Sequence, residues 1–154
     1  PGNNGGDGLE AATHLLQWGK TPIVTWLGNP AHLPADAKAA LDWARAANVN
    51  FATTPPDDCD FAIDALLGLG ASRPADGRLA DHINRLNALR TQGVPVLSVD
   101  IPSGLDADTG HAIGPCVQAS HTLALLTLKP GLHTAQGRDA AGEIWLDRLG
   151  LATH

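Results

Sequence analysis

Apolar residues along the chain alternate between a helical spacing and short continuous runs. Leu9, Ala12, Leu15 and Leu16 recur at helical spacing and predict a helix over residues 9–18, with Gly19 as its terminating glycine. Two further helices are predicted over residues 34–48 and from Leu79 to Gly93. Short apolar or β-branched runs predict strands at residues 22–27, 49–53, 61–67, 94–100, 121–128 and 143–146. This alternation of helices and apolar strands predicts an α/β domain with an open, parallel sheet covered by helices on both faces.

A glycine-rich stretch, residues 1–8 (PGNNGGDG), comes directly before the first predicted helix. Its four glycines allow positive φ and a close approach of a ligand to the backbone, and the helix behind it would present unpaired amides to an anion such as phosphate. The stretch contains no Lys or Arg, which excludes a Walker A motif. The side-chain oxygens of Asn3, Asn4 and Asp7 suit sugar hydroxyls or a hard cation. The structural alternative is an ordinary glycine-rich turn with an Asp cap.

The same stretch also fits a looser pattern of dinucleotide-binding enzymes. Gly6, Gly8 and Ala11 satisfy G-x-G-x-x-A, which leaves an NAD-dependent dehydrogenase as one alternative. The acidic residue expected about 20 positions later is missing, because the next predicted strand ends at Leu27-Gly28-Asn29. The missing ribose-binding acid therefore argues against the dehydrogenase alternative.

Carboxylates stand at the ends of two predicted strands. Asp64 lies in an otherwise apolar run, and Asp100 ends another strand shortly before Ser103. A carboxylate in such a position is costly unless it is paired, hydrogen-bonded or bound to a cation. Ligands of open parallel sheets bind at the carboxyl ends of the strands, so both residues are candidates for a site. The alternative is that each one caps the amides of the loop that follows it.

Other charged residues near these strand ends carry weaker predictions. Arg73 and Lys129 lie on candidate site loops and could meet a phosphate, but a solvated surface charge is the favoured interpretation for each. Asp106 is predicted to stabilise its own turn.

Composition narrows the class of protein. The chain has 154 residues, of which 44% are hydrophobic, which fits one globular domain. A net charge of −6 with three lysines is unlike a nucleic-acid binder, and no apolar run approaches the ~18 residues of a membrane span. Two isolated cysteines and the absence of a signal peptide favour a reducing, cytoplasmic location. The seven histidines show no metal-hydrolase spacing.

Four blocks together resemble the YjeF N-terminal domain family, whose enzymes are NAD(P)H-hydrate epimerases. In chain order they are Asn3-Asn4-Gly5-Gly6-Asp7-Gly8, Asp64-Ala65-Leu66-Leu67-Gly68, Val99-Asp100-Ile101-Pro102-Ser103-Gly104-Leu105-Asp106 and Lys129-Pro130-Gly131. The resemblance covers nearly the whole chain. It implies a Rossmann-like, doubly wound α/β/α fold. It further implies a single domain over residues 1–154 that lacks the family's N-terminal helical segment and first strand.

The resemblance also implies an activity and a set of site residues. The family's enzymes interconvert the R and S hydrates of NADH and NADPH (NADHX and NADPHX) in cofactor repair. The residues implied to bind this substrate are Asn3, Asn4, Gly5, Gly6, Asp7, Gly68, Leu69, Gly70, Ala71, Ser72, Arg73, Pro74 and Asp100. A potassium ion is implied at Asn4, Asp64 and Ser103. The implied partner is an ADP- or ATP-dependent dehydratase, fused C-terminally in some members, and a homo-oligomer is compatible with the family.

A mechanism follows from the chemistry of the hydrate. Its C6 carbon carries both a hydroxyl and the ring nitrogen, so the nitrogen lone pair can expel the hydroxyl and leave a planar, iminium-like intermediate. Asp100 is the candidate general acid that protonates the departing oxygen, and the general base that activates the returning water. A non-catalytic module of the same fold, which senses a nucleotide or binds a protein, is the competing hypothesis.

Overall fold

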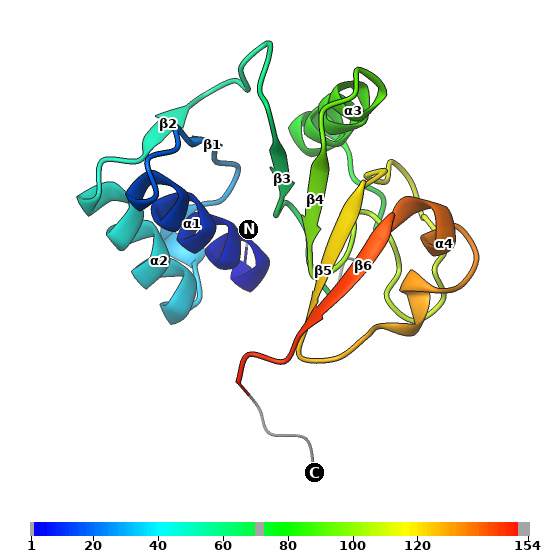
Figure 1. The fold of residues 1–154 in the computed structure, drawn as a ribbon. Helices are drawn as coiled ribbons and strands as arrows, with labels where there is room; N and C mark the ends of the chain where they lie inside the picture. Colours follow the sequence, from blue (N-terminus) through cyan, green and yellow to red (C-terminus); the bar gives the residue numbers. More distant parts are fainter. Residues whose placement is uncertain (1, 70–72, 151–154) are drawn as a thin grey trace. The chain divides into compact units, whose positions relative to one another are not determined.

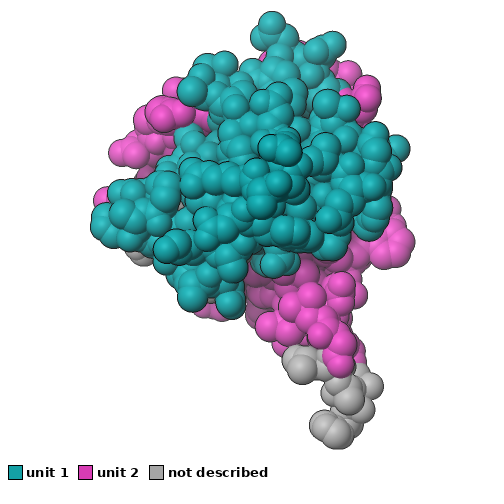
Figure 2. Space-filling view, turned by 90° about the vertical axis from the view of Figure 1, so that its left-hand side faces the viewer, with its two compact units in different colours: residues 1–59 teal, residues 60–154 magenta. Residues whose placement is uncertain are grey.

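The computed structural model describes residues 2–69 and 73–150, with side chains from residue 4 onward. The chain divides into two compact units, unit 1 (residues 1–59) and unit 2 (residues 60–154), which are described separately below (Figures 1 and 2). The expectation of a single domain over residues 1–154 stays a prediction.

Unit 1 contains two helices and a two-stranded parallel sheet. Its elements are α1 (Gly2–Gln17), β1 (Ile23–Thr25), a 3-10 turn η1 (Pro30–His32), α2 (Ala35–Ala46) and β2 (Asn50–Ala52). In this sheet Ile23 of β1 is paired with Asn50 of β2. Gly19 follows α1 with a φ of 84°, which confirms the prediction that it terminates this helix. The two helices pack on each other through a buried core of Leu9, Ala12, Ala40, Leu41, Ala44 and Val49.

The prediction that the glycine-rich stretch is a loop is wrong, because helix α1 already begins at Gly2. Gly5, Gly6 and Gly8 are helical and have negative φ. Each costs a helix about 1 kcal/mol relative to alanine, so packing has to offset the cost. Gly6 shows how: a Cβ there would lie 3.0 Å from the Ala37 Cα atom of α2. Its missing side chain lets the two helices approach closely.

Unit 2 contains a four-stranded, fully parallel sheet. Its elements are β3 (Ala62–Asp64), α3 (Gly77–Thr91), β4 (Val96–Val99), β5 (His121–Leu125), a 3-10 turn η2 (Pro130–Leu132), α4 (Gly137–Ala140) and β6 (Glu143–Asp147). The strands lie in the order β3-β4-β5-β6 (Figure 1). Parallel strands with intervening helices confirm the predicted α/β class, and they place all four carboxyl ends at one edge of this sheet.

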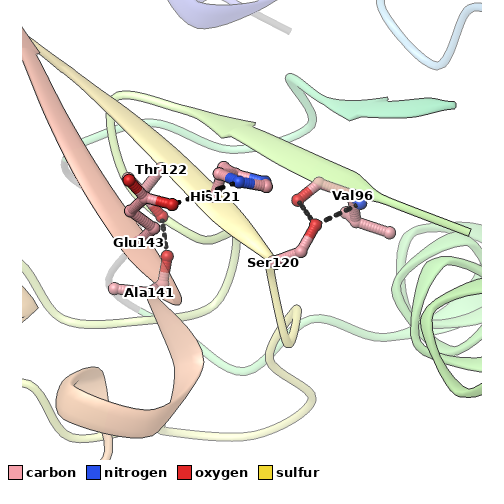
Figure 3. Close-up of polar contacts among 6 residues, drawn as sticks. All are labelled: Val96, Ser120, His121, Thr122, Ala141 and Glu143. Atoms are coloured by element: carbon pink, nitrogen blue, oxygen red, sulfur yellow. Dashed lines mark hydrogen bonds and ion pairs between the residues drawn. The ribbon is translucent and has the colours of Figure 1, made fainter. Parts of the chain in front are cut away.

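The amino-terminal edge of this sheet has its own polar contacts (Figure 3). The Ser120 hydroxyl donates to the Val96 carbonyl at 2.9 Å and accepts from the Val96 amide at 2.7 Å. His121 and Glu143 face each other across β5 and β6 at 3.5 Å, with exposed side chains. These contacts fix the register of the strands at the edge opposite to the candidate site.

Buried apolar residues hold unit 2 together in two clusters. One lies beside α3 and contains Ile83, Val96, Val117 and Ala119. The other contains Ile101, Leu105, Cys116, Ala124, Leu132, Ala140 and Ala141. No helix among the described residues is long and apolar enough to cross a membrane.

Candidate functional site

Asp64 ends strand β3 and is fully buried. Its parallel register with Ser98 of β4 places the two side chains together, and the Ser98 hydroxyl donates to Asp64 Oδ2 at 2.7 Å. The Ser103 amide donates to the same oxygen at 2.9 Å. The Ser103 hydroxyl lies 2.5 Å from Oδ1, and the Leu66 amide contacts Oδ1 at 3.3 Å. This buried carboxylate therefore joins the ends of two strands to the loops that follow them.

Ser103 connects Asp64 with the loop after β3. Its hydroxyl accepts a hydrogen bond from the Leu67 amide at 2.8 Å and lies 3.2 Å from the Leu67 carbonyl oxygen. Carboxylate, hydroxyl and carbonyl oxygens thus meet at one point. The interpretation that Asp64 caps the amides of its loop holds in part, because the Leu66 amide is one of its partners.

The charge of Asp64 has no basic partner within residues 4–69 and 73–150. Burial raises the pKa of the Asp64 carboxyl, and the hydrogen bonds from Ser103, Ser98 and Leu66 act in the opposite direction. Buried carboxylates without a counter-charge are costly, and a cation would remove that cost. An all-oxygen donor set suits a hard cation, so Asp64 and Ser103 fit the predicted potassium site in both charge and chemistry.

Asp100 follows strand β4 and has a strained backbone, with a φ of 70°. Its amide donates to the Leu123 carbonyl at 2.7 Å, and its Oδ1 atom accepts from the Leu125 amide at 3.0 Å. Asp tolerates this left-handed region better than most residues, at a cost of about 1–2 kcal/mol. Strain of this kind clusters at functional sites. The structure thus presents the Asp100 carboxylate at the same edge of the sheet as Asp64.

Lys129 forms an ion pair with Asp100, which the sequence did not reveal. The Lys129 ammonium contacts Asp100 Oδ1 and also donates to the Leu125 carbonyl at 2.6 Å. The two charged side chains are only 11% and 14% exposed. The interpretation of Lys129 as a solvated surface charge is therefore wrong.

The first candidate block lies in unit 1, on helix α1. Asn4, Gly5 and Gly6 are buried and Asp7 is exposed, while the side chain of Asn3 lies outside the described residues. Because α1 begins at Gly2, its first-turn amides come from within the motif itself. A hollow between α1 and α2 is lined by Gly6, Asp7, Glu10, Asp36 and Ala37. Its three carboxylates disfavour a phosphate in this hollow.

The loop after β3 is described only in part. Gly68 is half-buried, and Leu69, Arg73 and Pro74 are exposed. The predicted site residues Gly70, Ala71 and Ser72 lie outside the described residues. The substrate-binding role of this loop stays a prediction.

The structure brings together some of the predicted residues and adds two more. Asp64 and Ser103 are in direct contact, and Asp100 lies at the same edge of the sheet. Asn4, the third predicted potassium ligand, belongs to unit 1, so its contact with the other two stays a prediction. Ser98 and Lys129 were missed as partners of Asp64 and Asp100. The sequence held one indication for Ser98: it is a polar residue within an otherwise apolar predicted strand.

We expect the change of Ser103 to alanine to lower the free energy of unfolding by about 1.5–3 kcal/mol, because it removes a charge-assisted hydrogen bond to Asp64. The Leu67 amide also loses its acceptor. Urea unfolding monitored by circular dichroism measures the difference. The matched control is Ser120→Ala, whose hydroxyl contacts neutral Val96 backbone groups (Figure 3) and which should cost about 0.5–1.5 kcal/mol. Equal losses in the two variants would contradict a special role for the Asp64–Ser103 contact.

Comparisons with known proteins agree with the motifs. The family model described as YjeF-related protein N-terminus matches residues 1–131. The bifunctional NAD(P)H-hydrate repair enzyme of Leishmania major is 40% identical over 157 residues, a match that covers 97% of this chain and 28% of the relative. The NAD(P)H-hydrate epimerase of Achromobacter xylosoxidans (strain A8) is 42% identical, with 98% of this chain and 73% of the relative covered.

A solved structure has the same fold. The crystal structure of yeast ynu0 matches with a TM-score of 0.73 and 25% identity, over 88% of this chain and 59% of that chain. The chain spans less than a third of the length of the Leishmania relative. The family match over residues 1–131 confirms the resemblance found in the sequence. The chain belongs to the YjeF-related N-terminal family.

Proposed function

We propose that the chain catalyses epimerisation at C6 of the hydrates of NADH and NADPH, as part of nicotinamide cofactor repair. The observation that supports this most is the presence of two polar clusters at the carboxyl ends of adjacent strands: the buried pair Asp64 and Ser103, and the largely covered ion pair of Asp100 and Lys129. Ligands of parallel α/β sheets bind at that edge. The Achromobacter relative, 42% identical, is itself named an NAD(P)H-hydrate epimerase.

In this proposal Asp100 is the general acid and base. The C6–O bond of the hydrate breaks as the ring nitrogen lone pair forms a C=N bond, and Asp100 gives its proton to the departing oxygen. Water then adds to the opposite face of C6, the electron pair of the C=N bond returns to the ring nitrogen, and the proton that the water releases goes to Asp100, so that the enzyme ends as it began. General acid–base catalysis by a placed side chain contributes roughly 10²–10⁴-fold to a rate.

The test is direct conversion of one epimer into the other. Purified R-hydrate of NADPH is mixed with the protein in potassium buffer, and the S epimer is followed by chromatography against a sample without protein. We expect accelerated appearance of the S epimer. A folded protein that binds the hydrate without accelerating its conversion would instead support the non-catalytic, nucleotide-sensing hypothesis.

We further propose that potassium is the cofactor, held by Asp64 and Ser103 and joined by Asn4. The cation would supply positive charge that stabilises the buried carboxylate and the anionic part of the substrate. The support for it is that the buried Asp64 carboxylate has no basic partner among the described residues. The Ser103 hydroxyl and the Leu67 carbonyl beside it supply further oxygen atoms that could bind a cation.

We expect potassium to stabilise the protein, because an ion that binds the folded state adds RT ln(1 + [L]/Kd), or about 2.7 kcal/mol at roughly 100 times Kd. Unfolding free energies are compared in potassium chloride and choline chloride at equal ionic strength. The control is Asp64→Asn, which removes the charge and retains most of the shape. A potassium response of equal size in both proteins would contradict the site.

The proposed partner is an S-specific dehydratase that uses ADP or ATP. The Leishmania relative is named a bifunctional repair enzyme, and this chain matches 28% of it. We propose that the present chain supplies the epimerase step of such a pair and acts in the cytoplasm.

A further inference from the structure

Asp100, Lys129 and Leu125 form a closed ring of contacts. The Leu125 amide and the Lys129 ammonium both donate to Asp100 Oδ1, and the ammonium also donates to the Leu125 carbonyl. The ring joins the residue after β4, the last residue of β5 and the loop before η2. With the two charged side chains 11% and 14% exposed, water screens this pair much less than a surface ion pair.

The ring leaves the two carboxylate oxygens of Asp100 in different situations. Oδ1 accepts two hydrogen bonds, whereas Oδ2 has no hydrogen bond or ion pair to a residue in the ranges 4–69 and 73–150. Donors directed at Oδ1 make it an acceptor, so a proton that Asp100 carries belongs on Oδ2. The contacts of Oδ1 therefore determine that Oδ2 is the oxygen that exchanges a proton with the substrate.

We propose that Lys129 is a positioning residue that holds Asp100 Oδ1 and thereby directs Oδ2 to the reacting end of the substrate. This inference rests on the proposed epimerase function and gives Lys129 a role other than the phosphate contact considered from the sequence. A rotation of the carboxylate about its last bond would exchange the two oxygens. The two donors on Oδ1 make that rotation costly, because charge-assisted hydrogen bonds are about twice as strong as neutral ones.

The strained backbone of Asp100 also needs the ring. A φ of 70° places this residue in the left-handed region, at a cost of about 1–2 kcal/mol. Such strain persists where surrounding contacts over-determine the conformation. The bonds from Asp100 to Leu123, Leu125 and Lys129 supply those contacts. Lys129 thus holds both the side chain and the conformation of the segment that carries it.

A phosphate-binding role is the competing assignment for Lys129. An ammonium has three N–H donors, and two of them already contact Asp100 and the Leu125 carbonyl. A phosphate contact would act on substrate binding, whereas positioning of Asp100 acts on turnover. The two roles therefore separate in the kinetic constants.

The experiment replaces Lys129 with alanine and measures R-to-S conversion and hydrate binding. We expect kcat to fall by at least about 10-fold, with the Kd for the hydrate nearly unchanged. Added methylammonium should restore part of the lost kcat, because it can re-occupy the space of the missing ammonium and donate to Oδ1 again. Lys20→Ala, an exposed lysine in unit 1, is the matched control and should leave kcat unchanged.

A second variant distinguishes loss of the charge from loss of the fold. Lys129→Met keeps the aliphatic stem without the charge, and circular dichroism must show the parent's spectrum before its kinetics are compared. A higher Kd or KM with unchanged kcat in either variant would overturn the positioning role in favour of a phosphate contact. Parental kcat in the Lys129→Met variant would overturn it as well. A parent protein without epimerase activity overturns the proposed function itself, and with it this inference.

Discussion

Replacing Asp100 with asparagine is expected to lower kcat by roughly 10²–10⁴-fold, the usual contribution of a placed general acid or base. Asparagine keeps the shape of the side chain, and it tolerates the left-handed φ of 70° at this position. Its carbonyl oxygen can still accept from the Leu125 amide and the Lys129 ammonium. We therefore expect the variant to fold and to bind the hydrate, but to convert it very slowly. Chromatographic R-to-S conversion measures kcat, and titration with the hydrate measures Kd.

The control for this variant is Asp106→Asn on the segment that follows Asp100. Asp106 accepts hydrogen bonds from the Thr109 and Asp108 amides, which lower the pKa of its carboxyl and confirm the predicted role in its own turn. Its replacement should leave kcat within about two-fold of the parent, since its carboxylate is not part of the acid–base step. Parental turnover by the Asp100 variant would remove Asp100 from the proposed mechanism.

Replacing Gly131 with alanine is expected to destabilise the protein by roughly 3 kcal/mol, the upper part of the range for overpacking. A Cβ at this position would lie 2.2 Å from the Asp106 carbonyl oxygen and 2.7 Å from that of Ala107, and the backbone would have to move. For a chain of this length the loss corresponds to about 6–12 °C in Tm. Thermal unfolding by circular dichroism measures it. Because Gly131 follows Lys129 by two residues, a fall in kcat should accompany the loss of stability.

Ala135→Gly provides the comparison in the same segment. Ala135 has a φ of 46°, which glycine adopts without strain. The relief of backbone strain in the folded state therefore offsets the greater conformational entropy that glycine gives to the unfolded chain. Its stability should change by less than about 1 kcal/mol. If the Gly131→Ala variant unfolds at the parental temperature, the result would contradict the claim that the Lys129 loop packs tightly against residues 106–107.

Features with a local signature in the sequence were predicted well. The glycine that ends α1, the buried face of α2 with Ala37, Leu41 and Ala44, and the parallel strands all follow from periodicity and turn residues. The positions of Asp64 and Asp100 at strand ends also follow, because a carboxylate in an apolar run is conspicuous. These features depend on residues close together along the chain.

Features that depend on tertiary contacts were missed. Glycine has low helix propensity, so the sequence favoured a loop where α1 has its first two turns, and the contact of Gly6 with Ala37 was not visible. The ion pair of Lys129 with Asp100 joins residues that are distant in the chain, and nothing in the local sequence distinguishes it from a surface lysine. The register of β4 against β3 likewise decides that Ser98, among several polar residues, contacts Asp64.

The most direct test of the central claim couples this protein to the next step of repair. An R and S mixture of NADPH hydrate is incubated with an S-specific, ATP- or ADP-dependent dehydratase, and restored NADPH is measured by its absorbance. With the dehydratase alone, the R fraction should recover only at the slow, uncatalysed rate of epimer exchange. Addition of this protein should restore the whole pool quickly, while the Asp100→Asn variant should not. If the wild-type protein leaves the R fraction recovering at the uncatalysed rate, the epimerase assignment is contradicted.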